Sequence, residues 1–186
     1  RVMTKITLPT LADIEAASKR LQTHAVLTPL IENPPLNEKA GGRILLKAES
    51  LQRTGSFKFR GAYNFLSQIE PAARINGVVA YSSGNHAQGV AAAAQIFDIP
   101  ATIVMPSDAP LMKVENTRGY GAEVVLYDRV NESREDIAAE ISQLTGATLV
   151  PPYDHPWTIA GQGTVGLETV DQCEIIGVVP DAVLVC

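Results

Sequence analysis

Residues 78–89 read VVAYSSGNHAQG, and this segment gives the strongest indication of the architecture. Its apolar start, residues 78–81, predicts a buried strand, and the polar run that follows opens a predicted helix over residues 85–97. The free N–H groups at a helix start attract anions. Serine and asparagine are also ordinary N-caps. Five consecutive polar or glycine residues, 82–86, exceed what capping needs, so we favour a carboxylate-binding site.

The alternation of apolar runs with helical stretches continues on both sides of this segment. Further strands are predicted at residues 43–47, 101–105, 123–126, 148–150 and 182–185. Further helices are predicted at residues 11–23, 56–69, 111–120, 132–145 and 156–172. Strands that are apolar throughout are typical of parallel sheets covered on both faces. The predicted fold class is therefore α/β, with open, mostly parallel sheets and helices on both faces.

The last predicted strand, residues 182–185, ends one residue before the final Cys186. A parallel strand needs a crossover or a neighbour to cover its faces, and ligand-binding loops of open α/β sheets lie beyond the carboxyl ends of their strands. Because the sequence stops where such a loop would begin, we expect the fold to be C-terminally truncated.

Composition excludes several classes of function. The 186 residues carry a net charge of -5, which argues against a nucleic-acid surface. No apolar run approaches the roughly 20 residues of a membrane span, and no secretory signal opens the chain. The three histidines and two cysteines lack metal-ligand spacing, so we predict no metal site. Two reduced cysteines, Cys173 and Cys186, suit a cytoplasmic protein.

A lysine between two phenylalanines marks a second segment, TGSFKFRGA at residues 54–62. Lys58 alone would be an ordinary solvated residue at a helix start. Its apolar neighbours Phe57 and Phe59, and glycines that permit close backbone approach, suggest a different environment. Desolvation lowers the pKa of a lysine and yields an amine that can form a Schiff base with an aldehyde.

Together these segments resemble a known family, the fold-type II pyridoxal-phosphate enzymes, and within it the threonine/serine dehydratase and serine racemase branch. The matching residues are Ser56–Gly61, Ser82–His86 and the pair Tyr153-Asp154 followed by IAGQGT at residues 159–164. The resemblance runs from about Leu8 to the C-terminus. It implies a tryptophan-synthase-β-like architecture and pyridoxal 5'-phosphate as the cofactor.

The resemblance assigns cofactor-binding roles to three residues. Lys58 would hold pyridoxal phosphate through a Schiff base and then remove the α-proton of the substrate. Phe57 would pack near the cofactor ring, and Asn85 would hydrogen-bond the ring's 3-oxygen. The family's glycine-rich phosphate loop would follow the strand predicted at residues 182–185, and it is not in this sequence.

Substrate-binding roles follow from the same resemblance. Ser82, Ser83, Asn85 and His86 would bind the substrate carboxylate. Ser83 is also the position from which racemases offer a proton to the opposite face of the substrate, which makes it a second catalytic candidate. Arg134 matches a position that contacts acidic ligands in some relatives, although a solvated helix arginine is an equal alternative.

The implied reaction is dehydration and deamination of a β-hydroxy amino acid, threonine or serine, to a 2-oxo acid and ammonia, as in isoleucine biosynthesis. Alternatives are a serine racemase and a non-catalytic, truncated remnant of such an enzyme; a generic binding domain would need Lys58 to be incidental. The sequence leaves threonine, serine and hydroxyaspartate unresolved. We expect a small amino-acid substrate, no nucleic-acid or membrane partner, and a homo-oligomer, dimer or tetramer, when the protein is full length.

The resemblance also divides the chain. Residues 50–145 would form a small domain carrying the carboxylate-binding segment, and residues 1–49 and 146–186 would form an incomplete large cofactor domain. The sequence GQGTVG at residues 161–166 fits the dinucleotide fingerprint GxGxxG. That fingerprint counts only directly after a strand, and here a predicted helix precedes it. We therefore interpret these glycines as small residues for close helix packing.

Overall fold

The computed structural model of the protein describes residues 7–185. Its centre is a sheet of four parallel strands in the order β5-β4-β3-β6. The strands are β3 (Val78–Tyr81), β4 (Ala101–Pro106), β5 (Glu123–Tyr127) and β6 (Thr148–Leu149). Each was predicted within a few residues. The parallel pairing confirms the α/β class that their continuous apolar composition indicated.

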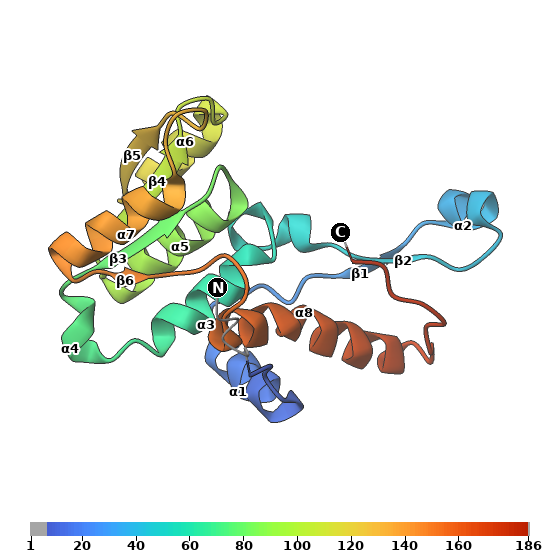
Figure 1. Ribbon diagram of the computed structural model, residues 1–186. Helices are drawn as coiled ribbons and strands as arrows, with labels where there is room; N and C mark the ends of the chain where they lie inside the picture. Colours follow the sequence, from blue (N-terminus) through green and yellow to red (C-terminus); the bar gives the residue numbers. More distant parts are fainter. Residues whose placement is uncertain (1–6, 186) are drawn as a thin grey trace.

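Helices cover both faces of this sheet (Figure 1). On one face, α5 (Asn85–Phe97) packs on β3 and β4, and α6 (Leu111–Gly119) packs on α5 and β5. On the other face, α7 (Arg134–Thr145) contacts β3, β4 and β6. Because successive side chains of a strand point to opposite faces, Val78 belongs to the core under α5, whereas Val79 packs with Ala138 of α7.

Three helices pack together beside the sheet: α1 (Leu11–Leu21), α3 (Lys58–Ser67) and α8 (Pro156–Ile175). The closest approach is at Gly161, where an added Cβ would lie 2.5 Å from the carbonyl oxygen of Arg60. The sequence GQGTVG thus lies inside α8 and not after a strand. This confirms helix packing as the reason for Gly161 and for Gly163, which faces Ile14 of α1, whereas a Cβ at Gly166 would meet no atom within 4 Å.

An arm built from β1 (Leu30–Glu32), α2 (Pro34–Ala40) and β2 (Leu45–Lys47) extends away from the sheet (Figure 1). The two strands pair antiparallel, with Leu30 opposite Lys47. The strand predicted at residues 43–47 is thus confirmed as β2, and its antiparallel partner is β1 within the same arm. Neither β1 nor α2 was predicted, although Asn33 followed by two prolines is a helix-start signal.

Short helical turns complete the chain: η1 (Glu49–Leu51), η2 (Arg53–Gly55) and α4 (Pro71–Arg74). Thr54 inside η2 has a φ of 66°, in the left-handed region. The first two turns join the arm to α3, and α4 joins α3 to the sheet. The chain therefore bends sharply just before Lys58.

The strand predicted at residues 182–185 is wrong. The structure has no regular element there, and Val183 and Leu184 are 70% and 95% exposed. An apolar run becomes a strand only when a neighbouring backbone supplies hydrogen bonds. Among residues 7–185, no strand pairs with this segment.

A buried group of charges joins the arm to α3 and α8. Its members are Lys47, Glu49, Arg60 and Glu168, called the Arg60 cluster below. Arg60 is fully buried and lies 2.8 Å from Glu49 and 2.6 Å from Glu168. Burial by itself lowers the pKa of Arg60, but hydrogen bonds to the two carboxylates outweigh it and raise this pKa. Removing one partner of such a set leaves an unpaired buried charge.

Candidate functional site

Lys58 begins α3 and lies half-buried between segments far apart in the sequence. Its Nζ donates a hydrogen bond to the Pro152 carbonyl at 2.8 Å and lies 5.3 Å from the centre of the Phe57 ring. Burial lowers the pKa of Lys58. A larger share of neutral amine is therefore present near neutral pH, and the neutral form is the nucleophile.

The first turn of α5 leaves its backbone donors free. Gly84 is the N-cap and offers no side chain to cap the helix. Gln88 N bonds the Gly84 carbonyl at 3.2 Å, so the N–H groups of the three residues between them have no intrahelical partner. Ser82 Oγ accepts from Gly84 N at 3.2 Å and holds the turn. The arrangement can bind an anion such as a carboxylate.

Gly89 brings the two segments together. A Cβ at Gly89 would lie 3.1 Å from the carbonyl carbon of Lys58 and 3.1 Å from the N of Phe59. The backbone of α3 therefore rests directly on α5 one turn after its start. Only a residue without a side chain permits this approach without movement. The two segments that the sequence singled out thus meet at Lys58.

Ser83 and Asn85 are exposed at the start of α5. Asn85 Oδ1 accepts a hydrogen bond from Lys113 Nζ at 2.8 Å. Ser83 projects from the turn between β3 and α5. The placement leaves both side chains accessible to a small molecule. Their predicted roles in binding pyridoxal phosphate and substrate stay predictions.

The ring of His86 is buried and bonded to the backbone. Its Nε2 lies 3.0 Å from the Val150 carbonyl oxygen, and because a carbonyl only accepts, Nε2 carries the proton. Burial, and to a lesser extent the charge of Lys58, lowers the pKa of His86 to about 4 although the bond to Val150 opposes this. The ring is therefore neutral at pH 7. Its bare Nδ1 would repel a carboxylate, so the part of His86 suited to substrate binding is its backbone N–H.

Arg134 begins α7, close to the carboxyl end of β3. Its guanidinium lies 5.2 Å from the centre of the Tyr81 ring, and its Nε donates to Glu135 at 2.8 Å. The hydrogen bond to Glu135 raises the pKa of Arg134, which is a cation at all ordinary pH values. Because Tyr81 directly precedes Ser82, the structure places Arg134 beside the base of the predicted carboxylate-binding segment.

Buried polar atoms without partners occur in both of these segments, around Lys58 and around Ser82–His86. Within residues 7–185, the buried side-chain atoms that have no hydrogen-bond partner are Thr54 Oγ1, Ser56 Oγ, His86 Nδ1 and Gln88 Nε2. Thr54 and Ser56 lead into α3, and the other two lie in the first turn of α5. Buried polar groups are normally paired, and a group left unpaired beside a partly desolvated lysine points to a site for a polar ligand.

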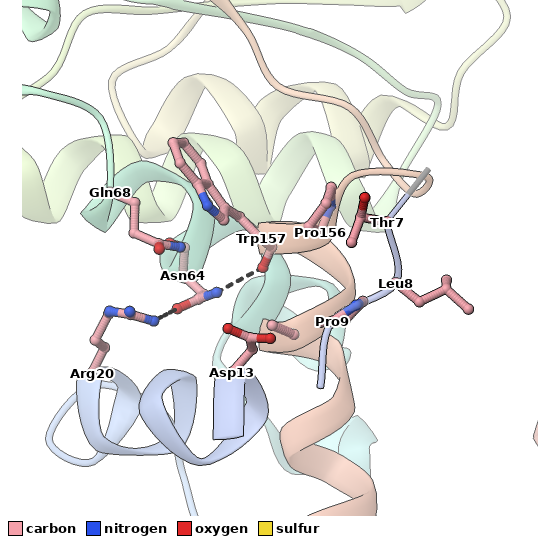
Figure 2. A pocket seen from close by; sticks show the side chains of 10 residues that line it. Thr7, Leu8, Pro9, Asp13, Arg20, Asn64, Gln68, Pro156 and Trp157 are labelled. Atoms are coloured by element: carbon pink, nitrogen blue, oxygen red, sulfur yellow. Dashed lines mark hydrogen bonds between the residues drawn. The ribbon is translucent and has the colours of Figure 1, made fainter. Parts of the chain in front are cut away.

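A separate cavity of about 310 Å³ lies where α1, α3 and the start of α8 meet (Figure 2). Asn64 lines it and links two of these helices, since its side chain accepts from Arg20 at 2.8 Å and donates to the Trp157 carbonyl at 2.7 Å. The cavity is at the C-terminal half of α3, whereas Lys58 is at its start. The predicted site residues do not line it.

In the described part of the chain, histidine, cysteine and acidic side chains do not gather in any group of three or more suited to a metal ion. None of the helices over residues 7–185 has the length and apolarity needed to cross a membrane.

Sequence reasoning missed the residues that surround Lys58 from the C-terminal side. Pro152 contributes only a backbone carbonyl, which carries no sequence signal. Gln162 lies within the matched segment IAGQGT but received no role. Its Nε2 is 3.4 Å from the same Pro152 oxygen.

Comparison with known proteins agrees with this geometry. Residues 21–186 match the family model described as pyridoxal-phosphate dependent enzyme. An L-threo-3-hydroxyaspartate ammonia-lyase from Pseudomonas sp is 52% identical over 159 residues, which are 86% of this chain and 50% of the relative. A serine racemase from Schizosaccharomyces pombe is 46% identical over 181 residues, which are 97% of this chain and 55% of the relative.

Solved structures share the fold. A maize serine racemase superposes with a TM-score of 0.87 at 38% identity, covering 90% of this chain and 51% of that one. The chain thus spans about half the length of the relatives it matches. These similarities confirm the predicted resemblance, and the family model covers most of the sequence. The chain belongs to the pyridoxal-phosphate dependent enzymes.

Proposed function

We propose that this chain provides the lysine and the carboxylate-binding turn of an ammonia-lyase that acts on a β-hydroxy amino acid, threonine or serine. The observation that supports it most strongly is the packing of the Lys58 backbone against Gly89, one turn into α5, a helix whose N-terminus has no side-chain cap. An amine with a lowered pKa and an anion site at one place are the groups that this reaction needs. The relatives are about twice as long as this chain. The activity of the whole protein is therefore part of the proposal.

The residues present fit the cofactor. Lys58 offers a partly desolvated amine for its aldehyde, and the unpaired buried hydroxyl of Ser56, two residues earlier, supports the presence of a further polar group here. Phe57 and Asn85 are the residues we assign to the cofactor ring. When bound, pyridoxal phosphate supplies an electron sink that makes the Cα–H bond of an amino acid acidic.

The protein groups orient the substrate and move protons. The N–H groups at the start of α5, with Ser82 and Ser83, would bind the substrate carboxylate and so fix the direction of the Cα–H bond. Lys58 Nζ, as the neutral amine, would accept the α-proton. Protonation of the leaving β-hydroxyl gives water, and hydrolysis of the resulting enamine gives the 2-oxo acid and ammonia.

Serine racemization is the second candidate, because Ser83 is exposed at the tip of the same turn. A hydroxyl there could return a proton to the face opposite Lys58. Chiral analysis of serine after incubation separates the two activities, since a lyase alone releases pyruvate and no D-serine. Ser83→Ala would abolish D-serine formation and leave a lyase activity measurable.

An acidic substrate is the third possibility within the same reaction class. Arg134 lies near the base of the turn, and its pairing with Glu135 is exposed and therefore easily exchanged. If hydroxyaspartate is the substrate, Arg134→Gln would raise the KM for hydroxyaspartate and leave the KM for threonine unchanged. Equal changes in both KM values would remove the assignment of Arg134 to a side-chain carboxylate.

The decisive test is chemical. Full-length protein is mixed with pyridoxal phosphate, its visible spectrum is recorded, and borohydride reduction is followed by peptide mapping. A label on Lys58, with release of 2-oxobutanoate from threonine, supports the lyase. A label without turnover of any amino acid would leave a non-catalytic remnant, and a label on another lysine contradicts the proposal.

Other expectations belong to this proposal. We propose that residues 50–145 form the substrate-binding unit, and that the full protein works in the cytoplasm as a homo-oligomer. A place in isoleucine biosynthesis would follow only from activity on threonine.

A further inference from the structure

Three consecutive carbonyl groups follow β6, and each accepts a hydrogen bond from a different side chain. Val150 O is 3.0 Å from His86 Nε2, Pro151 O accepts from Thr158 at 3.3 Å, and Pro152 O accepts from Lys58 at 2.8 Å. Prolines have no N–H to donate. The segment Val150–Pro152 therefore presents a row of acceptors toward α3, α5 and α8.

The last of these carbonyls has a second donor. Gln162 Nε2 lies 3.4 Å from Pro152 O, on the oxygen that Lys58 Nζ also contacts. Gly61, one turn after Lys58 on α3, makes room for this side chain. A Cβ at Gly61 would lie 2.9 Å from both Cγ and Nε2 of Gln162. The Gln162 side chain therefore packs against the backbone of α3 at Gly61, where a larger residue would collide with it.

The Gln162 amide becomes important when Lys58 gives up its hydrogen bond to the Pro152 carbonyl. Pro152 is buried, and a buried carbonyl without a donor is costly. We propose that Gln162 is a positioning residue for Lys58: its amide shares the Pro152 carbonyl with the lysine and keeps that carbonyl hydrogen-bonded when the lysine turns to the cofactor. This inference rests on the proposed function of Lys58.

The charges around Lys58 agree with this role. Its hydrogen-bond partner among the described residues is a neutral carbonyl, and burial lowers its pKa. The titratable group facing it is His86, whose pKa near 4 leaves it uncharged at neutral pH. Gln162 is neutral as well. An amide at this position therefore supplies a donor without a carboxylate that would hold the lysine as an ammonium.

The first experiment removes the donor and keeps the shape. Full-length Gln162→Met is titrated with pyridoxal phosphate, followed by its absorption spectrum and by borohydride mapping of Lys58. We expect about tenfold weaker capture, equivalent to about 1.4 kcal/mol, because Pro152 O loses its donor when Lys58 reacts. The exposed Gln95 of α5 provides the control, Gln95→Met, which should equal wild type.

Two results would overturn the inference. If wild type is labelled at Lys58 and Gln162→Met captures the cofactor equally well, Gln162 has no positioning role. If wild type is not labelled at Lys58, the proposed function fails and the inference fails with it.

The second experiment needs no cofactor and decides the matter if Gln162→Met does not fold. Acetylation of Lys58 by acetic anhydride is followed against pH by mass spectrometry, with Lys113 as internal reference. In Gln162→Glu a carboxylate close to the amine should raise the acetylation midpoint by about one pH unit. Gln95→Glu adds the same charge elsewhere. A midpoint shift no larger than that of Gln95→Glu would refute the role of Gln162.

Discussion

The Arg60 cluster and the contact of Lys58 with α5 lie on the same helix, two residues apart, and differ in how their polar groups are paired. Arg60 is fully buried, and its guanidinium nitrogens bond Glu49, Glu168, Thr164 and the Val26 carbonyl. Near Lys58, by contrast, the buried Ser56 Oγ and His86 Nδ1 have no partner in the described chain. Complete pairing is typical of a structural network, whereas unpaired groups at a partly buried amine are typical of a binding site.

The largest expected effect is that of replacing Lys58, the partly buried amine with unpaired groups near it. Lys58→Met should abolish borohydride-dependent labelling and reduce turnover by about 10²–10⁴-fold or more, because the amine is both the attachment point and the proton acceptor. The free energy of unfolding should change little, since Lys58 has a single hydrogen bond. Assays of 2-oxo acid release together with urea unfolding measure both quantities. Turnover at the wild-type rate would remove Lys58 from the mechanism.

Arg60→Met should show the opposite pattern in stability. It leaves the largely buried Glu49 without its arginine and Glu168 with Lys47 as its remaining cation, which should lower the free energy of unfolding by about 3–5 kcal/mol. Urea unfolding monitored by circular dichroism measures this change. Arg134→Met is the matched control, because the Arg134 pair is exposed and should contribute about 0–1 kcal/mol. Similar losses of unfolding free energy in Arg60→Met and Arg134→Met would show that the Arg60 cluster contributes no more to stability than an exposed ion pair.

The Arg60 cluster should also make the free energy of unfolding depend on pH in the acid range. Burial alone raises the pKa of Glu168, but its bonds to Arg60 and Lys47 prevail and lower it below 4.5. A lowered folded-state pKa contributes stability above the unfolded value of 4.5, and this contribution is lost as pH falls through the folded value. Unfolding free energies measured from about pH 6 to about pH 3 should fall less steeply in Glu168→Gln. Glu135→Gln should change the slope less than Glu168→Gln, because the bond to Arg134 lowers the pKa of Glu135 but this pair is exposed to solvent.

The smallest effect concerns a single unpaired hydroxyl. Ser56 Oγ is buried without a partner, so Ser56→Ala should raise the free energy of unfolding of the cofactor-free protein by about 1 kcal/mol. Thermal unfolding of the cofactor-free protein measures the gain. A loss of stability instead would mean that the hydroxyl has a partner, and Ser56 would then belong with the paired groups.

Local sequence pattern predicted the elements that are set by local chemistry. The strands β3 and β4 and the helix α5 followed from continuous apolar runs and from the polar turn at Ser82–His86. Of the arm, β2 was predicted, but β1 was missed because it is only three residues long. The strand predicted at residues 182–185 failed for a different reason. Strand formation depends on a neighbour distant in sequence, and apolar composition cannot report whether that neighbour is present.

The candidate site divides in the same way. The segments around Lys58 and Ser82–His86 were recognizable because side chains define them. Their contact depends on Gly89, whose meaning appears only when α3 is seen resting on it. The acceptor of Lys58 is a backbone oxygen of Pro152, and any residue has one. The hydrogen bond of the His86 ring likewise goes to the backbone oxygen of Val150, which is distant in sequence and which no local pattern indicates.

The prolines after Val150 also have a consequence for conformational entropy. A proline ring fixes φ near its folded value even in the unfolded chain, so Pro151 and Pro152 have little backbone freedom to lose on folding. The acceptor for Lys58 is thereby ordered before any ligand arrives. Less of the binding free energy is then spent on arranging the lysine's surroundings, which is the thermodynamic meaning of a preorganised site.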